Sequence, residues 1–317
     1  MVQWWGRRKR VQGQVGLSLG EHITLAHVIQ DRDDVNLTYC VHTGRAQDGV
    51  AASGDQRTQL ARLVDDAGLK GMPTNLMLSS TEYSLFLVDA PPVPAEEMAA
   101  AVRWKIKDLL DFPAENAIVD IFELPADATR NRSSAMVYVV AAPRARLEQR
   151  IAMVEQSGLT LQAIDIPEMT LRNITSRFGD DSNGLAFLSL QANGGILNIT
   201  RKGQLYLTRR INLPVARDDV SSDELEGLRD RLVLEVQRSL DYFESQMAQD
   251  PVARMLIAPR DQKSFAVANG LAEALATPLT VVDFYHEIDA PDWVDDELKA
   301  ACLSTIGAAL RTDNGAV

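Results

Sequence analysis

The stretch "VGLSLGEHITLAHV", residues 15–28, decides the fold. Apolar residues alternate with small or polar ones on both sides of the turn at Gly20, which predicts two antiparallel strands joined by a tight turn. A glycine-edged hairpin near the start of a chain can hold a phosphate, and such hairpins carry an acidic residue that holds the metal. Ser18 occupies that position here. The stretch is either a phosphate hairpin that has lost its chemistry or a hairpin only.

The composition is that of a globular protein. The chain has 317 residues, 46% of them hydrophobic and 24% charged, which suits two domains. No apolar run approaches the roughly 20 residues that span a bilayer, and the start has no apolar segment typical of a secretory signal. Two distant cysteines indicate a reducing compartment, and with four scattered histidines they offer no metal-ligand spacing. The net charge of −12 argues against nucleic-acid binding.

The N-terminal tail, residues 1–12, differs from the rest of the chain. An aromatic pair precedes a run of four cations: Trp4, Trp5, Arg7, Arg8, Lys9 and Arg10. Aromatic rings followed by cations suit the interface of an anionic membrane, which predicts a weak, reversible peripheral contact. A solvated tail that touches no membrane is the alternative.

One pattern of elements occurs twice along the chain. Residues 13–80 read as the hairpin, a third strand, a helix and a buried strand, and this half continues through residues 160–180. Residues 181–317 repeat the order with three strands, a long helix over 222–247, a strand, a helix, a strand and a final helix. The sequence therefore predicts an α/β fold of two duplicated half-domains.

Residues 81–159 interrupt the first copy and read as a small inserted β-α-β-β-α subdomain. Its first helix, over 95–112, has Met98, Val102, Ile106 and Leu109 at spacings of three and four and is closed by Phe112 and Pro113. Two strands follow, over 117–124 and 135–141, and a second helix ends at Gly158.

Several segments together resemble a known family. They are "AAAVRWKIKDLLDFPAENAIVDIFEL" (99–124), "MVYVVAAPRARLEQRIAMVEQSGLTLQAIDIPEMTLRNI" (136–174), "LVLEVQRSLDYFESQM" (232–247) and "CLSTIGAALR" (302–311). Their order and spacing resemble the PilM group of actin-like proteins, which includes the MshI proteins of mannose-sensitive haemagglutinin (MSHA) pili. The resemblance covers about residues 11–311 and is nearest to MshI. It implies the actin-like, ribonuclease H-like fold.

The resemblance also implies a place in the cell and a partner. Members of this group are cytoplasmic and are recruited to the inner face of the inner membrane of Gram-negative bacteria. There they bind the N-terminal cytoplasmic tail of a PilN- or MshJ-like bitopic membrane protein within the assembly platform of a type IV pilus. The pilus assembly ATPase is a further partner. A type II secretion platform component of similar fold is the alternative, although those components carry a transmembrane helix of their own.

Family members that bind ATP have an aspartate in each of two phosphate hairpins and a glycine pair at the adenosine. In this chain Ser18 stands at the first aspartate position, and Glu21 follows Gly20 in the turn, where a carboxylate repels phosphate. In the second hairpin, Ser189 and Gln191 stand at the aspartate and glycine positions.

The adenosine turn departs from the family as well. It reads Ala258-Pro259, and proline lacks a backbone donor. We therefore expect a pseudo-ATPase with no catalytic residue, no metal and no ATP or Mg²⁺ cofactor. Weak nucleotide binding, or an active ATPase or small-molecule kinase of the same fold, is the alternative.

Partner binding is expected at the insert. Trp104 lies off the apolar stripe of its helix, and Phe112 follows that helix, so the two side chains could line a groove for an extended apolar peptide. Family resemblance places this groove between the insert and the first half-domain. The alternative is that both residues anchor the helix in the core.

Overall fold

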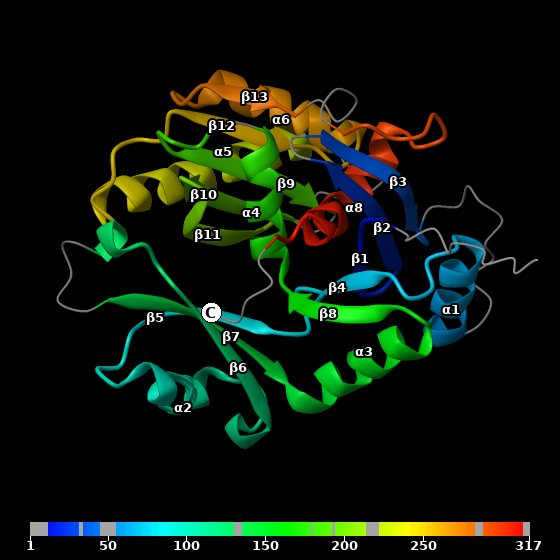
Figure 1. Ribbon diagram of the computed structural model, residues 1–317. Helices are drawn as coiled ribbons and strands as arrows, with labels where there is room; N and C mark the ends of the chain where they lie inside the picture. The colour runs from blue at the N-terminus through cyan, green and yellow to red at the C-terminus, as the bar shows by residue number, and fades with distance from the viewer. Residues whose placement is uncertain are drawn as a thin grey trace, which may run out of the picture.

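Two halves of the same plan, and a small sheet inserted in the first, make up the structure (Figure 1). This computed structural model describes residues 12–31, 34–44, 55–129, 135–178, 180–191, 194–213, 222–282 and 288–312. The first half contains β1 (Gln14–Leu19), β2 (Ile23–Asp31), β3 (Asp34–His42), α1 (Gln56–Asp66), β4 (Pro73–Met77), α3 (Arg144–Gln156), β8 (Thr160–Asp165) and α4 (Pro167–Phe178). The second half contains β9 (Leu185–Gln191), β10 (Gly194–Arg201), β11 (Gln204–Asn212), α5 (Ser222–Ser245), β12 (Arg254–Ala258), α6 (Gln262–Ala274), β13 (Leu279–Val281) and α8 (Asp296–Ala309). The insert contains β5 (Ser84–Asp89), α2 (Ala95–Ile106), β6 (Ala117–Glu123) and β7 (Met136–Pro143).

The duplication predicted from the sequence is confirmed by the sheet order. The first sheet runs β3-β2-β1-β4-β8 and the second runs β11-β10-β9-β12-β13. In both sheets the first strand lies at the centre, pairs antiparallel with the second strand and pairs parallel with the strand that follows the first helix. Each half is therefore one copy of the same β-β-β-α-β-α-β-α unit.

Helices fill three layers around the two sheets (Figure 1). Leu60 of α1 and Met153 of α3 pack with β1 on the outer face of the first sheet. On the outer face of the second sheet, α5 and α6 bury their apolar stripes. Between the sheets lie α4 and α8, whose Leu171 and Cys302 share one core with residues of both sheets.

α8 also rests directly on β1 at Gly16. A Cβ atom on Gly16 would lie 1.7 Å from the backbone oxygen of Thr305. Only glycine leaves room for a helix to rest directly on the strand backbone at this point. The hairpin that opened the sequence analysis is thus held against the last helix of the chain.

The packing of α3 differs from the sequence analysis, which assigned this helix to the inserted subdomain of residues 81–159. Met153 and Val154 of α3 pack in the core of the first half. In the duplicated plan α3 leads from the insert into β8, as α6 leads into β13. Hydrophobic periodicity predicts a helix here but does not say which sheet the helix covers. Without α3, the insert is a three-stranded sheet of order β5-β7-β6 covered by α2.

The end of α2 also differs from the prediction. The α-helix stops at Ile106, and residues 107–109 form a 3-10 turn. A 3-10 turn advances three residues per turn instead of 3.6, which rotates Leu109 off the apolar stripe. Its side chain is 59% exposed, whereas Val102 and Ile106 are buried.

Candidate functional site

A polar cavity lies where the two hairpins of the duplicated halves meet. Ser18 at the end of β1 and Ser189 near the end of β9 both line it, and so do Glu21 and Gln191. Its volume is about 450 Å³, and α8 forms one wall. The two hairpin positions that sequence reasoning singled out separately are thus brought together.

Further polar groups of this cavity were missed by the sequence analysis. His22 and His42 pack edge to face with ring centroids 5.2 Å apart, and Nδ1 of His42 is 2.9 Å from Oγ1 of Thr24. Arg260, which follows the expected adenosine turn, also lines the cavity. No local motif signals His42 or Arg260, because β3 and the β12–α6 loop reach the cavity only in the folded chain, whereas His22 directly follows Glu21 in the turn of the first hairpin.

The turn after β12 uses its backbone donors internally. The N–H groups of Arg260 and Asp261 each donate to Oγ of Ser264, 2.8 Å away, in the capping box of α6. Neither Ala258 nor Pro259 lines the cavity. Backbone groups that already cap a helix are not available to a ligand.

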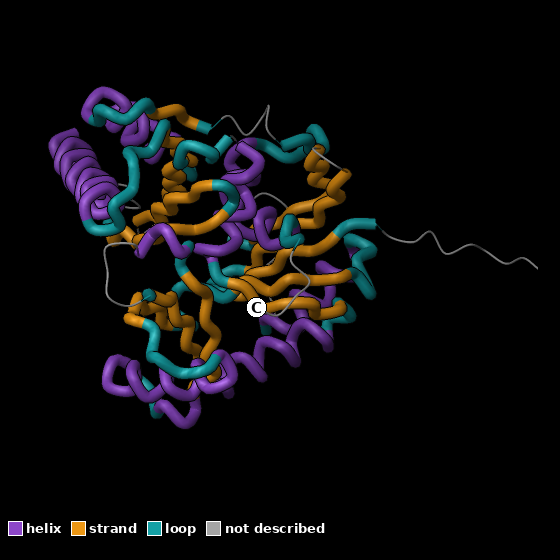
Figure 2. The backbone as a smooth tube through the Cα atoms, turned by 60° about the vertical axis from the view of Figure 1, so that its left-hand side comes forward, coloured by secondary structure: helices purple, strands orange, loops and turns teal. Residues whose placement is uncertain are grey.

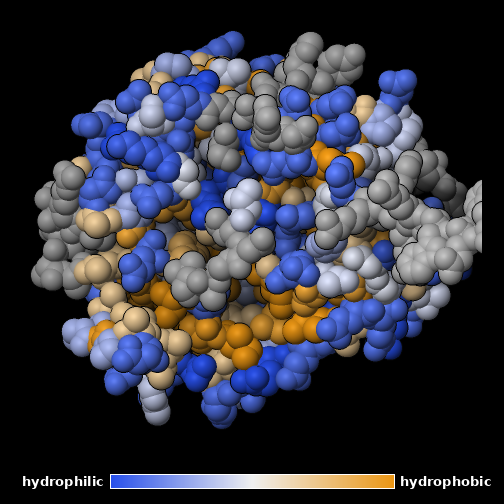
Figure 3. All heavy atoms as spheres, in the orientation of Figure 1, coloured by the Kyte–Doolittle hydropathy of each residue, from blue (hydrophilic) through white to orange (hydrophobic). Residues whose placement is uncertain are grey.

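A second hollow, which we call the insert groove, lies between the inserted sheet and the first half. Its volume is about 320 Å³. Its walls include Ile118, Asp120 and Phe122 of β6, Leu147 of α3, and Ile164 and Asp165 of β8. In Figure 3 apolar side chains gather around a depression in the lower part of the same face, over the inserted strands and β8.

One end of the insert groove is closed by an ion pair. Nη1 of Arg311 lies 3.0 Å from Oδ2 of Asp165, and the backbone N–H of Ile166 donates to Oδ1. Burial raises the pKa of the Asp165 carboxyl, and the nearby Arg311 guanidinium opposes this shift. The groove therefore offers mostly apolar walls and one polar end.

Trp104 and Phe112 line a different hollow from the insert groove. Both lie beside the C-terminal end of α2 in a depression of about 700 Å³. Trp104 is 71% exposed, and Nζ of Lys107 lies 5.1 Å from the centroid of its ring. Phe112 is half-buried and packs against the core of the insert. The two residues come together as expected, but away from the groove between the insert and the first half.

The aromatic and basic tail, Trp4 to Arg10, lies outside the described residues. Among the helices that the structure describes, none has both the length and the apolar character needed to cross a bilayer.

Comparison with solved structures shows the fold. The chain superposes on a chain of the "PilM-PilN type IV pilus biogenesis complex" with a TM-score of 0.69 and 18% sequence identity, over 95% of this chain and 98% of that chain. A protein from Bacteroides thetaiotaomicron, with an actin-like ATPase fold and unknown function, matches with a TM-score of 0.50 and 11% identity over 92% and 95% of the two chains. This chain has the actin-like fold.

Another structural neighbour comes from a secretion system. The cytoplasmic domain of EpsL, an inner membrane component of the type II secretion system of Vibrio cholerae, matches with a TM-score of 0.51 and 8% identity over 94% of each chain. No family profile matches the sequence.

The lining of the cavity is poor in carboxylates, the side chains that Mg²⁺ prefers as ligands. Carboxylates at both hairpins are the ligands that Mg²⁺ prefers, whereas serines stand at both positions here. Among the described residues that line the cavity, Glu21 is the one with a carboxylate. Across the described part of the chain, no cluster of three or more histidine, cysteine or acidic residues could hold a metal.

Proposed function

We propose that this chain is a non-catalytic, actin-like adaptor in the assembly platform of a type IV pilus. It binds the N-terminal cytoplasmic tail of a bitopic, PilN-like membrane protein in the insert groove, at the cytoplasmic face of the inner membrane. The observation that carries the proposal is the insert groove, which is lined by side chains of the inserted sheet and of β8. The superposition on a chain of the PilM-PilN complex supports the same partner class.

Strand order makes the insert groove suitable for an extended peptide. β6 ends the order β5-β7-β6, and β8 ends the order β3-β2-β1-β4-β8, so each strand has one edge without a neighbour within its sheet. An added strand would satisfy the backbone groups along such an edge, and side-chain pockets would select its sequence. Residues of both edge strands line the groove.

The side chains on the walls of the insert groove determine which peptide tail it would accept. Ile118, Phe122 and Ile164 offer apolar contacts, whereas Asp120 is exposed. We therefore propose a tail with alternating apolar side chains, and a cation placed to meet Asp120.

The pilus assignment rests on the degree of structural similarity. The superposition is closer to the chain from the PilM-PilN complex, with a TM-score of 0.69, than to the EpsL domain, with 0.51. An MSHA-type pilus follows from the sequence resemblance to MshI. A type II secretion platform is the second candidate, which the EpsL superposition supports.

Absence of catalysis is the other half of the proposal. Serines at the two metal positions and the internally capped turn after β12 support a cleft that neither holds Mg²⁺ nor hydrolyses ATP. The pilus assembly ATPase is then a separate partner, and the Trp104 hollow is a second surface at which a partner could dock.

Affinity capture from detergent-solubilised inner membranes tests the tail-binding proposal. Ile118→Glu should abolish recovery of a bitopic protein that the wild type retains, because it places a charge on an apolar wall. Ala99→Glu, at an exposed position on α2, is the matched control and should leave recovery unchanged. Trp104→Ala should also leave it unchanged; loss with Trp104→Ala but not with Ile118→Glu would transfer the tail to the Trp104 hollow.

A further inference from the structure

The polar cavity between the two hairpins contains two buried hydroxyl groups. Ser18 and Ser189 both line it, with only 8% and 4% of their surface exposed. Neither side chain makes a hydrogen bond with any group in the described part of the chain. A buried polar group that lacks a partner costs free energy, which a ligand with a matching polar atom recovers. The two hydroxyls are thus available to a group that enters the cavity.

The charged and titratable groups of the cavity favour an anion. Arg260 lines it, and its guanidinium forms no ion pair with the residues that the structure describes. His22 and His42 add two imidazole rings. Glu21 contributes the single carboxylate of the described lining. A guanidinium donates hydrogen bonds and accepts none, so it binds an oxoanion and not a metal ion.

Polar side chains form a row across the first sheet at this end. Ser18 of β1 pairs with Thr24 of β2, and Thr24 pairs with His42 of β3. Nδ1 of His42 lies 2.9 Å from Oγ1 of Thr24, which orients the imidazole ring. A Cβ atom on Gly44 would lie 2.9 Å from Nε2 of His22 and equally far from Nε2 of His42. Glycine at this position therefore keeps open the space beside both Nε2 atoms.

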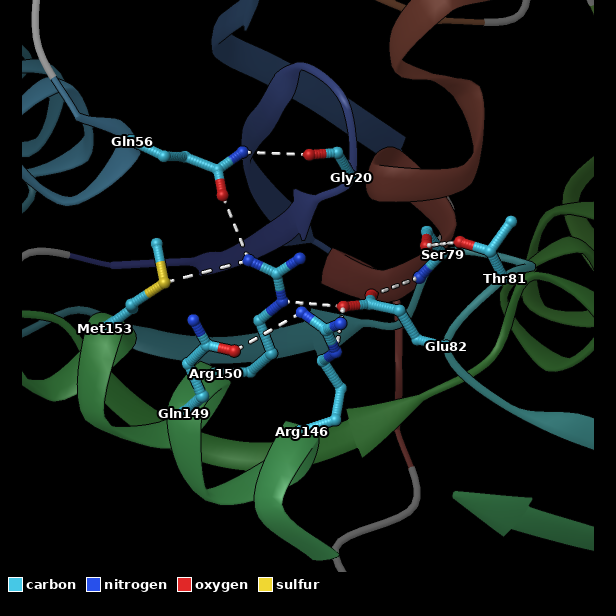
Figure 4. Close-up of polar contacts among 9 residues, drawn as sticks. All are labelled: Gly20, Gln56, Ser79, Thr81, Glu82, Arg146, Gln149, Arg150 and Met153. Carbon is cyan, nitrogen blue, oxygen red and sulfur yellow. Dashed lines mark hydrogen bonds and ion pairs between the residues drawn. The ribbon is translucent and has the colours of Figure 1, made fainter. Parts of the chain in front are cut away.

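The turn that carries Glu21 and His22 is held by side chains that do not line the cavity (Figure 4). Nε2 of Gln56, on α1, donates to the backbone oxygen of Gly20 over 2.9 Å. Nη1 of Arg150, on α3, donates to Oε1 of Gln56 over 3.0 Å. The turn is thereby fixed to two helices of the first half.

The same network fixes a second part of the cavity wall. Nε of Arg150 lies 2.7 Å from Oε1 of Glu82, and Oε2 of Glu82 accepts from the backbone N–H of Ser79 over 2.9 Å (Figure 4). Ser80, the next residue, lines the cavity. A binding site is effective when such outer contacts hold its lining in place before the ligand arrives.

The remaining walls belong to the second half and to α8. Ser189 and Gln191 lie at the end of β9, and Arg260 follows β12. In Figure 2 helices occupy the space between the strands of the two halves, and one of them, α8, contributes Ser304 and Thr305 to the cavity. A ligand of this cavity would therefore contact both copies of the duplicated unit.

We propose that the cavity binds a single small oxoanion of the phosphate type without a metal ion. The hydroxyls of Ser18 and Ser189 and the guanidinium of Arg260 donate hydrogen bonds to its oxygen atoms. The volume of about 450 Å³ is within the range of small-molecule sites. Glu21 repels additional negative charge, so the site accepts one phosphate group and rejects a triphosphate. This proposal goes beyond the adaptor role and does not depend on the insert groove.

Calorimetric titration of the full chain with inorganic phosphate tests the site. The buffer is freed of metal ions by a chelating resin and contains no other oxoanion. The wild type should bind one phosphate per chain. Arg260→Gln, and separately Ser18→Ala with Ser189→Ala, should each weaken binding about tenfold or more, because each removes donors. Arg62→Gln removes an exposed cation of α1 outside the cavity and is the matched control, with a Kd within about twofold of the wild type.

Two further variants test the sign of the charge and the position of the ligand. Glu21→Gln should bind phosphate about threefold more tightly, because a repelling charge at an exposed position is removed. Gly44→Ala should weaken binding, because its methyl group displaces the two imidazole rings. Glu21→Gln changes an exposed side chain and keeps the fold, so the test does not depend on the stability of Gly44→Ala.

The source of the oxoanion is distinguished by a parallel titration with glycerol 2-phosphate. Tighter binding of the ester would support a phosphorylated small molecule as the ligand, and tighter binding of inorganic phosphate would support the free ion. Absence of saturable binding of both would overturn the proposal. A Kd that Arg260→Gln leaves unchanged, or binding that requires Mg²⁺, would overturn it as well.

Discussion

Ser18 on β1 and Ser189 on β9 occupy equivalent places in the two halves and line one cavity. Ser18 is the last residue of β1 to pair with β4, opposite Met77, and Ser189 is the last residue of β9 to pair with β12, opposite Ala258. The two hydroxyl groups are thus related by the duplication and lie in the same cavity.

The first prediction concerns nucleotide binding. Titration of the protein with a fluorescent ATP analogue and Mg²⁺ should show no saturable binding in the micromolar range, because serines and not carboxylates line the cavity at both hairpins. Phosphate release should match that of a Ser18→Ala, Ser189→Ala variant. Micromolar binding, or phosphate release that the variant loses, would contradict the pseudo-ATPase proposal.

The second prediction concerns the contact between α8 and β1. Gly16→Ala should reduce the free energy of unfolding by about 3 kcal/mol or more, because the added Cβ displaces a backbone oxygen and lifts the helix. Urea denaturation measures this loss. Gly227→Ala is the matched control, since no atom lies within 4 Å of its added Cβ; it should raise stability by roughly 0.5–1 kcal/mol.

The third prediction contrasts two neighbours on α2. Trp104→Ala should change the free energy of unfolding by less than about 0.5 kcal/mol, since the side chain is largely exposed. Ile106→Ala should cost about 2–5 kcal/mol because it leaves a cavity in the core of the insert. A large loss with Trp104→Ala would assign this residue to the core and not to a docking surface.

The fourth prediction concerns pH. Because burial raises the pKa of Asp165, the folded state binds its proton more tightly than the unfolded state. The stabilising effect of this proton is full below the unfolded pKa and is lost as pH rises through the folded pKa. Asp165→Asn should therefore gain stability relative to the wild type as the pH rises from the unfolded pKa of about 4 through the higher folded pKa. Urea denaturation at several pH values measures the difference in the free energy of unfolding between the two proteins. A stability advantage of Asp165→Asn that shrinks as the pH rises would contradict the prediction.

The duplicated fold could be predicted from the sequence because its signals are local. Alternating apolar residues around glycine turns predicted the strands, and the apolar stripe from Leu228 to Phe243 predicted α5. For Trp104 the sequence left both a groove and a core role open, and the structure shows its side chain to be exposed.

The arrangement of the elements in space was less predictable. Helical periodicity does not say which sheet a helix covers, so α3 was assigned to the insert although it packs in the first half. The polar residues that complete the cleft, such as His42 and Arg260, come from distant segments and carry no motif. The same holds for the Glu82–Arg150 pair, whose members are 68 residues apart.

Site-specific photo-crosslinking in the host bacterium tests the central claim most directly. A photoreactive amino acid at Asp120, an exposed position on the wall of the insert groove, should crosslink to the N-terminal cytoplasmic segment of a protein with one transmembrane helix. The same amino acid at Ala99 should give no such product. A crosslink from Ala99 to that segment with none from Asp120, or a product from Asp120 that is not a membrane protein, would contradict the account.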